Sequence, residues 1–169
     1  MKPVLRTTRV YSRDTPPEQQ RTASNDEGPY PLTTKPVGPA YCPSCKAAFV
    51  AGRWTWDRKP EDAYEHVCPA CQRIHDKFPA GVVTLKGEFF KQHRDEIVTF
   101  IKSTEVREKA EHPLQRIMAI EEVREGVQVT TTDSALARVI GETLHETYKG
   151  DLKLKYSRDE NLLRAIWKR

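Results

Sequence analysis

The sequence predicts an α+β fold in which a small cysteine-bearing module precedes an ordinary domain. Three observations carry this prediction. The four cysteines of the chain fall into two close pairs. From Gly81 onward, amphipathic helical patterns alternate with short runs of β-branched residues. The first 40 residues hold seven of the twelve prolines and show no apolar periodicity. We therefore expect a disordered proline-rich arm over residues 1–40, the small module over 41–80 and the larger domain over 81–169.

The proline-rich arm has two interpretations. It carries six Lys or Arg against four Asp or Glu, which fits a basic arm that docks into a larger partner. A plain flexible tail explains the composition equally well, because a chain this poor in apolar residues cannot bury enough surface to fold. The sequence leaves both interpretations open.

Both cysteine pairs have the form Cys-Pro-x-Cys, and 22 residues separate them. Two thiolates at this spacing bind one metal ion from a tight turn, and two such turns complete a tetrahedral site of four sulfur ligands. A closed site of this kind has no open coordination position for a substrate. The pattern therefore predicts a zinc ribbon at residues 41–80, with a structural Zn²⁺ bound by four thiolates. The predicted ligands are Cys42, Cys45, Cys68 and Cys71.

Other roles for these residues are less well supported. Disulfides need an oxidising compartment, and the N-terminal sequence breaks off before it forms a signal-peptide core. A redox pair opens a thioredoxin-like βαβ unit and is not expected twice. His66 and His75 flank the second pair and could replace a thiolate, although four well-spaced cysteines are present. Phe49, Trp54 and Trp56 lie between the pairs and either pack over the site, which is the commoner use, or stack on bases.

The composition bounds the function. A net charge of +4 and a pI near 8.9 allow an anionic partner such as RNA without requiring one. No apolar run approaches the length of a membrane span, so with reduced cysteines we expect a cytoplasmic protein with no membrane partner. The five histidines form no motif with a nucleophile, and no glycine-rich phosphate loop is present. We therefore expect neither an enzyme nor a small-molecule substrate.

From Gly81 onward, the expected elements follow the order β-α-β-β-α-β. We expect strands at residues 82–85, 117–120, 127–130 and 151–156, a helix at 88–111, and a second helix from an N-cap at Thr132 or Asp133 to Gly150. Residues 161–167 add a last strand or a short helix. This order matches a split βαβ, ferredoxin-like (βαββαβ) domain.

Apolar periodicity also predicts the core of that domain. The buried stripe of the first helix comprises Phe90, His93, Ile97, Ile101 and Thr104. The stripe of the second comprises Leu136, Ile140, Leu144 and Thr147. Trp167 is expected in the core rather than as a stacking platform.

The end of the chain is locally basic. Residues 148–169 carry seven Lys or Arg against three acidic residues. Side chains two apart on a strand lie about 7 Å from each other, comparable with successive phosphates of a nucleic acid. The candidate nucleic-acid-binding residues are Lys149, Lys153, Lys155, Arg158, Arg164 and Lys168. Lysines on an exposed strand also discourage edge-to-edge pairing of sheets, and the sequence does not decide between the two roles.

Several stretches of the chain resemble one protein family. They are the two Cys-Pro-x-Cys pairs, the segment Arg73–Pro79 with the strand–helix unit after it, and the stretches Thr132–Leu144 and Tyr148–Tyr156. They look like the nonsense-mediated-decay protein three family, the export adaptor of the large ribosomal subunit in eukaryotes and its archaeal relatives. Small bacterial relatives with one zinc-ribbon module are more similar still. The resemblance covers about residues 41–157. Its most specific part is the pattern Leu-Ala-Arg-x-Ile-Gly-x-x-Leu followed by Tyr-x-Gly-x-Leu-Lys.

The resemblance implies binding to ribosomal RNA or to a ribosomal surface. Long members of that family have more than one cysteine-pair module, further β domains and a transport tail, and this chain has a single pair of knuckles. A nuclear-export role is therefore not expected.

Two functions from different classes remain. The first is a non-catalytic, zinc-containing protein that associates with RNA or the ribosome. The alternative is a protein–protein interaction adaptor with a structural zinc site and no nucleic-acid binding. Salt distinguishes them, because phosphate contacts weaken steeply with ionic strength and an apolar protein interface does not.

Overall fold

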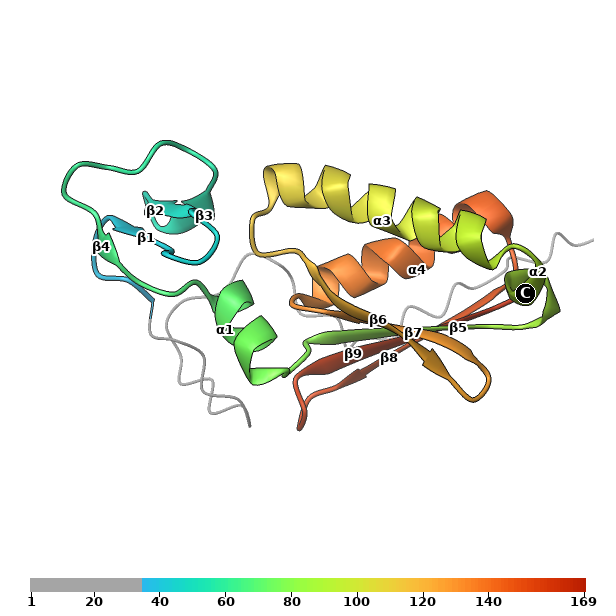
Figure 1. Ribbon diagram of the computed structural model, residues 1–169. Coiled ribbons are helices and arrows are strands. Elements are labelled where there is room, and N and C mark those ends of the chain that lie inside the picture. The colour runs from blue at the N-terminus through green and yellow to red at the C-terminus, as the bar shows by residue number, and fades with distance from the viewer. Residues whose placement is uncertain (1–34) are drawn as a thin grey trace, which may run out of the picture.

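The computed structural model describes residues 35–169. Residues 1–34, most of the predicted proline-rich arm, lie outside the described part. Two sheets and four helices make up the described residues. We call residues 40–76, which contain the smaller sheet, the small module, and residues 81–168, which contain the larger sheet, the large module. The small module lies at one end of the large one, with α1 between the two sheets (Figure 1).

The small module is built from very short elements. They are β1 (Ala40–Tyr41), β2 (Ala48–Val50), β3 (Arg53–Thr55), β4 (Tyr64–Glu65) and α1 (Pro69–Asp76). The strand order is β3-β2-β1-β4, with β4 parallel to β1 and the other pairs antiparallel. Within residues 40–76, Phe49 is the one large apolar side chain that is buried. The other buried apolar residues are alanines and cysteines. Packing of this kind cannot hold a unit of fewer than about 40 residues together by itself.

The large module has more and longer elements. They are β5 (Gly81–Lys86), α2 (Glu88–Gln92), α3 (Arg94–Glu111), β6 (Ile117–Val123), β7 (Gly126–Thr131), α4 (Ser134–Tyr148), β8 (Asp151–Ser157) and β9 (Leu162–Lys168). Each predicted strand is present, and the last segment, left open by the sequence, is a strand. Asp133 is the N-cap of α4, where its carboxylate accepts a hydrogen bond of 2.6 Å from the Ala135 amide.

The helical predictions need two corrections. The expected helix at residues 88–111 is divided at His93, whose backbone is not helical (φ −113°, ψ 23°). The His93 ring leaves the buried stripe and stacks on Phe89 with centroids 4.2 Å apart, and its Nδ1 lies 3.2 Å from the Glu96 carboxylate. Thr147 was expected in the stripe of α4 and is exposed, because its neighbour Tyr148 takes the core-facing position in the last turn of that helix.

The large sheet has five strands in the order β6-β7-β5-β9-β8. β9 lies between β5 and β8, parallel to the first and antiparallel to the second. The four-stranded βαββαβ prediction contained no strand at this position, and the ferredoxin-like arrangement is not confirmed. The reason lies in the apolar residues: Leu163, Ala165 and Trp167 of β9 are buried, whereas Leu154 and Tyr156 of β8 stay more than a third exposed. The more apolar strand takes the interior position.

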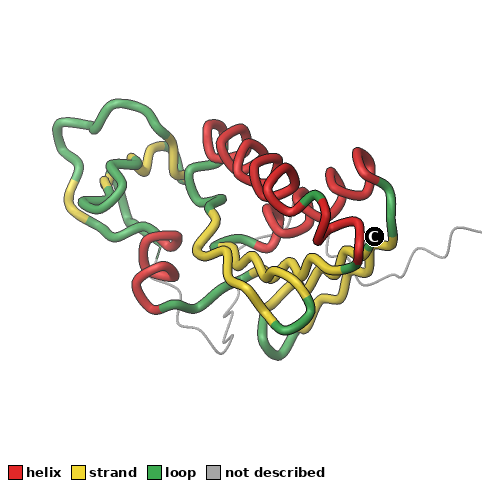
Figure 2. Tube along the Cα trace, turned by 45° about the vertical axis from the view of Figure 1, so that its right-hand side comes forward, coloured by secondary structure: helices red, strands yellow, loops and turns green. Residues whose placement is uncertain are grey.

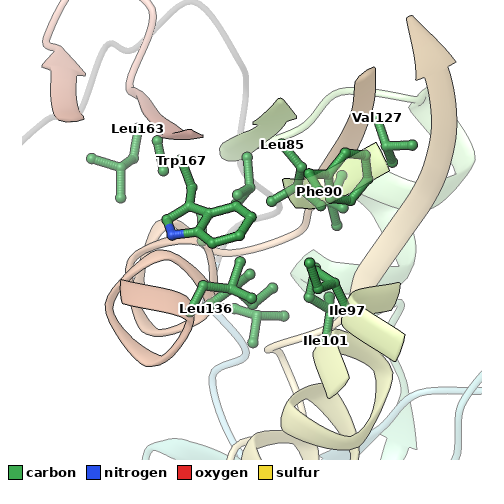
Figure 3. Packing of buried hydrophobic residues seen from close by; sticks show 14 residues of the cluster. Leu85, Phe90, Ile97, Ile101, Val127, Leu136, Leu163 and Trp167 are labelled. Atoms are coloured by element: carbon green, nitrogen blue, oxygen red, sulfur yellow. The ribbon is translucent and has the colours of Figure 1, made fainter. Parts of the chain in front are cut away.

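One face of this sheet carries the core. α3 and α4 lie side by side on that face (Figures 1 and 2). Side chains from both helices, from α2 and from the strands meet there, with the Trp167 indole above Leu136 and Leu85 close to Phe90 (Figure 3). Trp167 is fully buried, as the sequence predicts.

The opposite face of the sheet has no helix packed on it in the described residues (Figure 2). We call it the open face. Residues that are register partners on neighbouring strands share a face, so the pairs Lys155↔Arg164 and Asp151↔Lys168 both lie on it. None of the described helices is both long and apolar enough to cross a membrane.

Candidate metal centre and basic sheet face

The four cysteines come together in the small module. Their sulfur atoms all lie within 4.8 Å of one another. Cys42 and Cys68 are fully buried, and Cys45 and Cys71 are partly so. The sulfurs of Cys45 and Cys68 are 3.7 Å apart, far beyond a disulfide bond of about 2.05 Å. A tetrahedral ion with metal–sulfur bonds of about 2.3 Å would hold its ligands about 3.8 Å apart. The cluster therefore has the dimensions of a four-sulfur metal site.

Local backbone structure aims both pairs at one point. In the first pair, the chain turns back through Lys46, whose φ is +68° and whose amide donates to the Cys42 carbonyl at 2.9 Å. The second pair begins α1: Cys68 is its N-cap, and the Cys68 sulfur accepts a hydrogen bond of 3.4 Å from the Cys71 amide. The Cys68 amide in turn donates to the Cys42 sulfur at 3.4 Å. Such N–H···S bonds and the helix N-terminus both favour thiolates.

A residue of the large module completes this environment. Arg116 lies just before β6 and is only 7% exposed. Its Nη1 is 3.3 Å from the Cys71 sulfur and its Nη2 is 3.8 Å from the Cys68 sulfur. Its Nε donates to the Pro113 carbonyl at 2.8 Å. Because a guanidinium stays protonated in proteins and is costly to bury unpaired, its position indicates that the cysteines carry negative charge.

The pKa values of the thiols shift in different directions. The pKa of Cys45 is lowered to about 4, above all because Cys68 donates a hydrogen bond to it. The pKa of Cys68 is raised because it donates that bond and is buried, and burial raises the pKa of Cys71. Burial alone would lower the pKa of Arg116, but the sulfur atoms around the guanidinium outweigh burial and raise it. Burial and the neighbouring sulfur atoms thus oppose ionisation of Cys68 and Cys71, and a bound cation would favour their thiolates.

The other residues singled out between the cysteine pairs have structural roles. Trp54 packs against the cysteine cluster. The His66 ring stacks on the Trp54 ring, with the two ring centroids 6.3 Å apart. Among the described residues, the one group of side chains placed to hold a metal is the cysteine cluster, and neither His66 nor His75 belongs to it. Trp56 does not cover the site. Its indole donates to the Lys109 carbonyl at 2.6 Å and so joins the small module to the end of α3.

The predicted nucleic-acid-binding residues fall into two groups. Lys153, Lys155, Arg164 and Lys168 lie together on the open face, because the β8–β9 register aligns them across two strands. Lys149 follows α4, where its Nζ donates to the Glu146 carbonyl at 2.9 Å, and Arg158 lies in the turn between β8 and β9. These two do not belong to the face.

The open face also contains a basic residue that sequence reasoning missed. Lys86 of β5 is the register partner of Lys168, and its Nζ is 3.2 Å from the Glu125 carboxylate. Arg164 forms an ion pair of 2.9 Å with Glu160. Within the described part of the chain, Lys153, Lys155 and Lys168 have no ion-pair partner. We call Lys86, Lys153, Lys155, Arg164 and Lys168 the basic face.

Arg116 also escaped sequence reasoning. The sulfur atoms that Arg116 contacts belong to Cys71 and Cys68, which precede it in the chain by 45 and 48 positions. No local periodicity or motif around Arg116 marks it, so no signal in a single sequence would have found it.

A hollow of about 540 Å³ lies between the two modules. The tip of the β2–β3 hairpin lines one side of it, and residues 111–115 line the other. Its lining has no cysteine, serine or lysine, and the acidic and basic groups around it are largely exposed.

Comparison with protein-family models, with curated proteins and with solved structures finds no match to this chain. The resemblance to the nonsense-mediated-decay protein three family therefore stays a prediction.

Proposed function

We propose that this protein is a non-catalytic binding protein, in which a zinc ion holds the small module together and the basic face binds the phosphate backbone of ribosomal RNA. The carrying observation is the register of β8 and β9, which gathers Lys153, Lys155, Arg164 and Lys168 on a sheet face that no described helix covers. The resemblance of several sequence segments to a ribosome-associated family supports the choice of RNA.

Zinc is the metal that best suits the cysteine cluster. Four thiolate ligands at tetrahedral spacing favour Zn²⁺ over Mg²⁺ or Ca²⁺, which prefer oxygen. The four residues would bind it, and the bound ion would supply cohesion that the alanine-rich packing of the small module lacks. A closed set of four protein ligands leaves no position for a substrate, which supports a structural role.

Like charges on the basic face support an anionic partner. Lys155 and Arg164 are directly opposite each other on neighbouring strands, as are Lys86 and Lys168. Like charges directly opposite each other destabilise a sheet. An anion bound across these pairs would relieve that repulsion, and the counterions released on binding would add to the affinity.

The composition of the face favours backbone contacts over reading of bases. The other residues of the open face include Leu162, Ile166, Val82, Thr84, Gln128, Thr130 and Ser157, together with the acidic residues Asp151 and Glu121. None is aromatic, whereas a sheet that binds unpaired bases uses aromatic side chains as stacking platforms. We therefore expect binding with little sequence preference and a strong dependence on salt.

The experiment compares two double variants of the full chain. Lys153→Gln with Lys155→Gln removes two charges from the basic face, and Lys91→Gln with Lys102→Gln removes two exposed charges from α2 and α3 on the other side. Binding to purified ribosomal subunits is measured over a salt series. The first pair should lower the slope of log affinity against log salt by about one to two, because each phosphate neutralised by a lysine accounts for about 0.7–0.9 of that slope. The α2 and α3 pair should leave it unchanged.

Equal binding by both double variants at every salt concentration would refute the basic face as the RNA site. It would favour the second candidate, a protein–protein adaptor. One observation supports that candidate: Leu154 and Tyr156 on the edge strand β8 are 37% and 41% exposed and lie on the side of the sheet away from the basic face. Two neighbouring apolar side chains on an edge strand suit a protein partner.

A further inference from the structure

The contact between Arg116 and the cysteines joins two parts of the chain that are otherwise separate in sequence. The Arg116 backbone belongs firmly to the large module: its amide donates to Thr132 Oγ1 at 3.0 Å, and its carbonyl accepts from the Thr132 amide at 2.9 Å. The guanidinium reaches into the small module and contacts two of the four sulfur atoms. The large module thus presents a buried cation to the metal centre.

Further contacts lie around this one. The Arg116 guanidinium carbon is 5.7 Å from the Trp56 ring centroid, close enough for a cation–π interaction. The Trp56 indole donates to the Lys109 carbonyl. Leu114, two residues before Arg116, packs on the cysteine cluster. The cation, the indole and the leucine form one junction between the modules.

We infer that Arg116 makes the docking of the small module onto the large module depend on the metal. The inference rests on the metal half of the proposed function and not on RNA binding. Four thiolates (−4) with one divalent ion (+2) leave a formal charge of −2 beside a guanidinium of +1. Without the ion, nothing else holds the four sulfur atoms together, and the buried guanidinium loses the sulfur atoms that it contacts.

Arg116 therefore acts on the metal through the ligands. Its N–H groups hold the Cys68 and Cys71 sulfurs in place and reduce the repulsion among the thiolates, as other outer-shell hydrogen bonds do for metal ligands. The coupling runs in both directions. The bound metal strengthens docking, and docking strengthens metal binding.

The three tryptophans of the chain can report each part of this inference separately. Trp54 packs on the cysteine cluster and reports the fold of the small module. Trp56 donates its indole N–H to the Lys109 carbonyl and reports docking. Trp167 is fully buried, with its indole N–H bonded to the Lys149 carbonyl at 2.8 Å, and reports the fold of the large module. Indole N–H signals of the full chain, labelled with ¹⁵N-tryptophan, therefore distinguish undocking from unfolding.

Arg116→Met keeps the length of the side chain and removes its charge and hydrogen bonds. In the zinc-loaded variant, the Trp54 and Trp167 signals should stay in place while the Trp56 signal shifts and exchanges faster with solvent. Zinc should also pass to a competing chelator with an affinity about 10–100-fold weaker than in the parent. Arg107→Met is the control, because Arg107 is exposed on α3 and pairs with Glu108. It should change neither quantity.

If the Trp56 signal or the zinc affinity of Arg116→Met stays at the parent value, the inference is wrong. Loss of the Trp167 signal would mean that Arg116→Met has unfolded. In that case, the inference is tested on the parent protein instead. Removing zinc from the parent with a chelator should release Trp56 and leave Trp167 in place. A Trp56 signal that survives complete zinc removal would contradict the inference, and a zinc content near zero before chelation would instead refute the metal centre.

Discussion

The two modules of this protein are held together by different forces. The large module buries a continuous apolar cluster of 14 residues between one sheet face and three helices. Each large apolar side chain buried in this way contributes about 1.5–3 kcal/mol. In the small module, the corresponding cluster consists of Cys42, Cys68 and Ala70. Its packing offers little apolar surface, and four convergent sulfur atoms take the place of a core.

This difference explains where each module can carry charge. The large module has a core on one sheet face that is sufficient by itself, so its other face is free to collect Lys153, Lys155 and Lys168, which form no ion pair within the described residues. The small module has no apolar core of comparable size. Its buried cation partner, Arg116, comes from the large module and lies against the sulfur atoms themselves. The stability of the small module therefore depends on a charged side chain, that of Arg116, which the large module supplies.

Removing the metal should produce the largest difference between the modules. Chelation of zinc, or Cys68→Ser, should unfold residues 41–76, because binding energies of about 10–16 kcal/mol for structural zinc are also folding energies. Residues 81–168 should stay folded. Hydrogen exchange followed by mass spectrometry measures both in one sample. A loss of protection that spreads evenly through both modules would show that they form a single cooperative unit.

Trp167→Ala should have the reverse effect. The substitution removes the largest fully buried side chain of the large module and should destabilise it by about 3–5 kcal/mol. The zinc content of the folded protein should remain at one ion per chain. Thermal unfolding combined with metal analysis measures both quantities. Val106→Ala is the control, because Val106 on α3 is 70% exposed and should leave the stability of the large module nearly unchanged.

The cap of α4 contributes less. Asp133→Ala removes the carboxylate that accepts from the Ala135 amide and should lower the free energy of unfolding of the large module by about 1 kcal/mol. Asp133→Asn keeps an acceptor oxygen at the same place and should recover most of the loss. Denaturant titration resolves the difference. Equal stability of all three proteins would mean that the cap does not limit the stability of this module.

The smallest effect on folding is expected on the basic face. Lys153→Gln and Lys155→Gln should each change the stability of the large module by less than about 0.5 kcal/mol, because both side chains are exposed on the open face. Denaturant titration of the double variant tests this. A slight gain in stability would agree with the repulsion between Lys155 and Arg164.

The parts of this structure that the sequence predicted are local ones. The spacing within each cysteine pair, the period-two pattern of residues 151–156 and the N-cap Asp133 each depend on residues a few positions apart, and all appear in the structure. The insertion of β9 between β5 and β8 depends on which strand competes better for the interior position, which no single segment reveals. The contact of Arg116 with the sulfur atoms depends on how two modules meet. Sequence patterns therefore identified the four clustered cysteines and most of the basic face but not the junction.

Sedimentation through a sucrose gradient tests the central claim, that the basic face binds the ribosome, most directly. In lysate at low salt, the protein should travel with ribosomal subunits, and at high salt it should move to the top of the gradient. The variant with Lys153→Gln and Lys155→Gln should leave the ribosomal fractions at a lower salt concentration than the parent, while the variant with Lys91→Gln and Lys102→Gln should follow the parent. A parent protein that stays at the top of the gradient even at low salt would contradict the account.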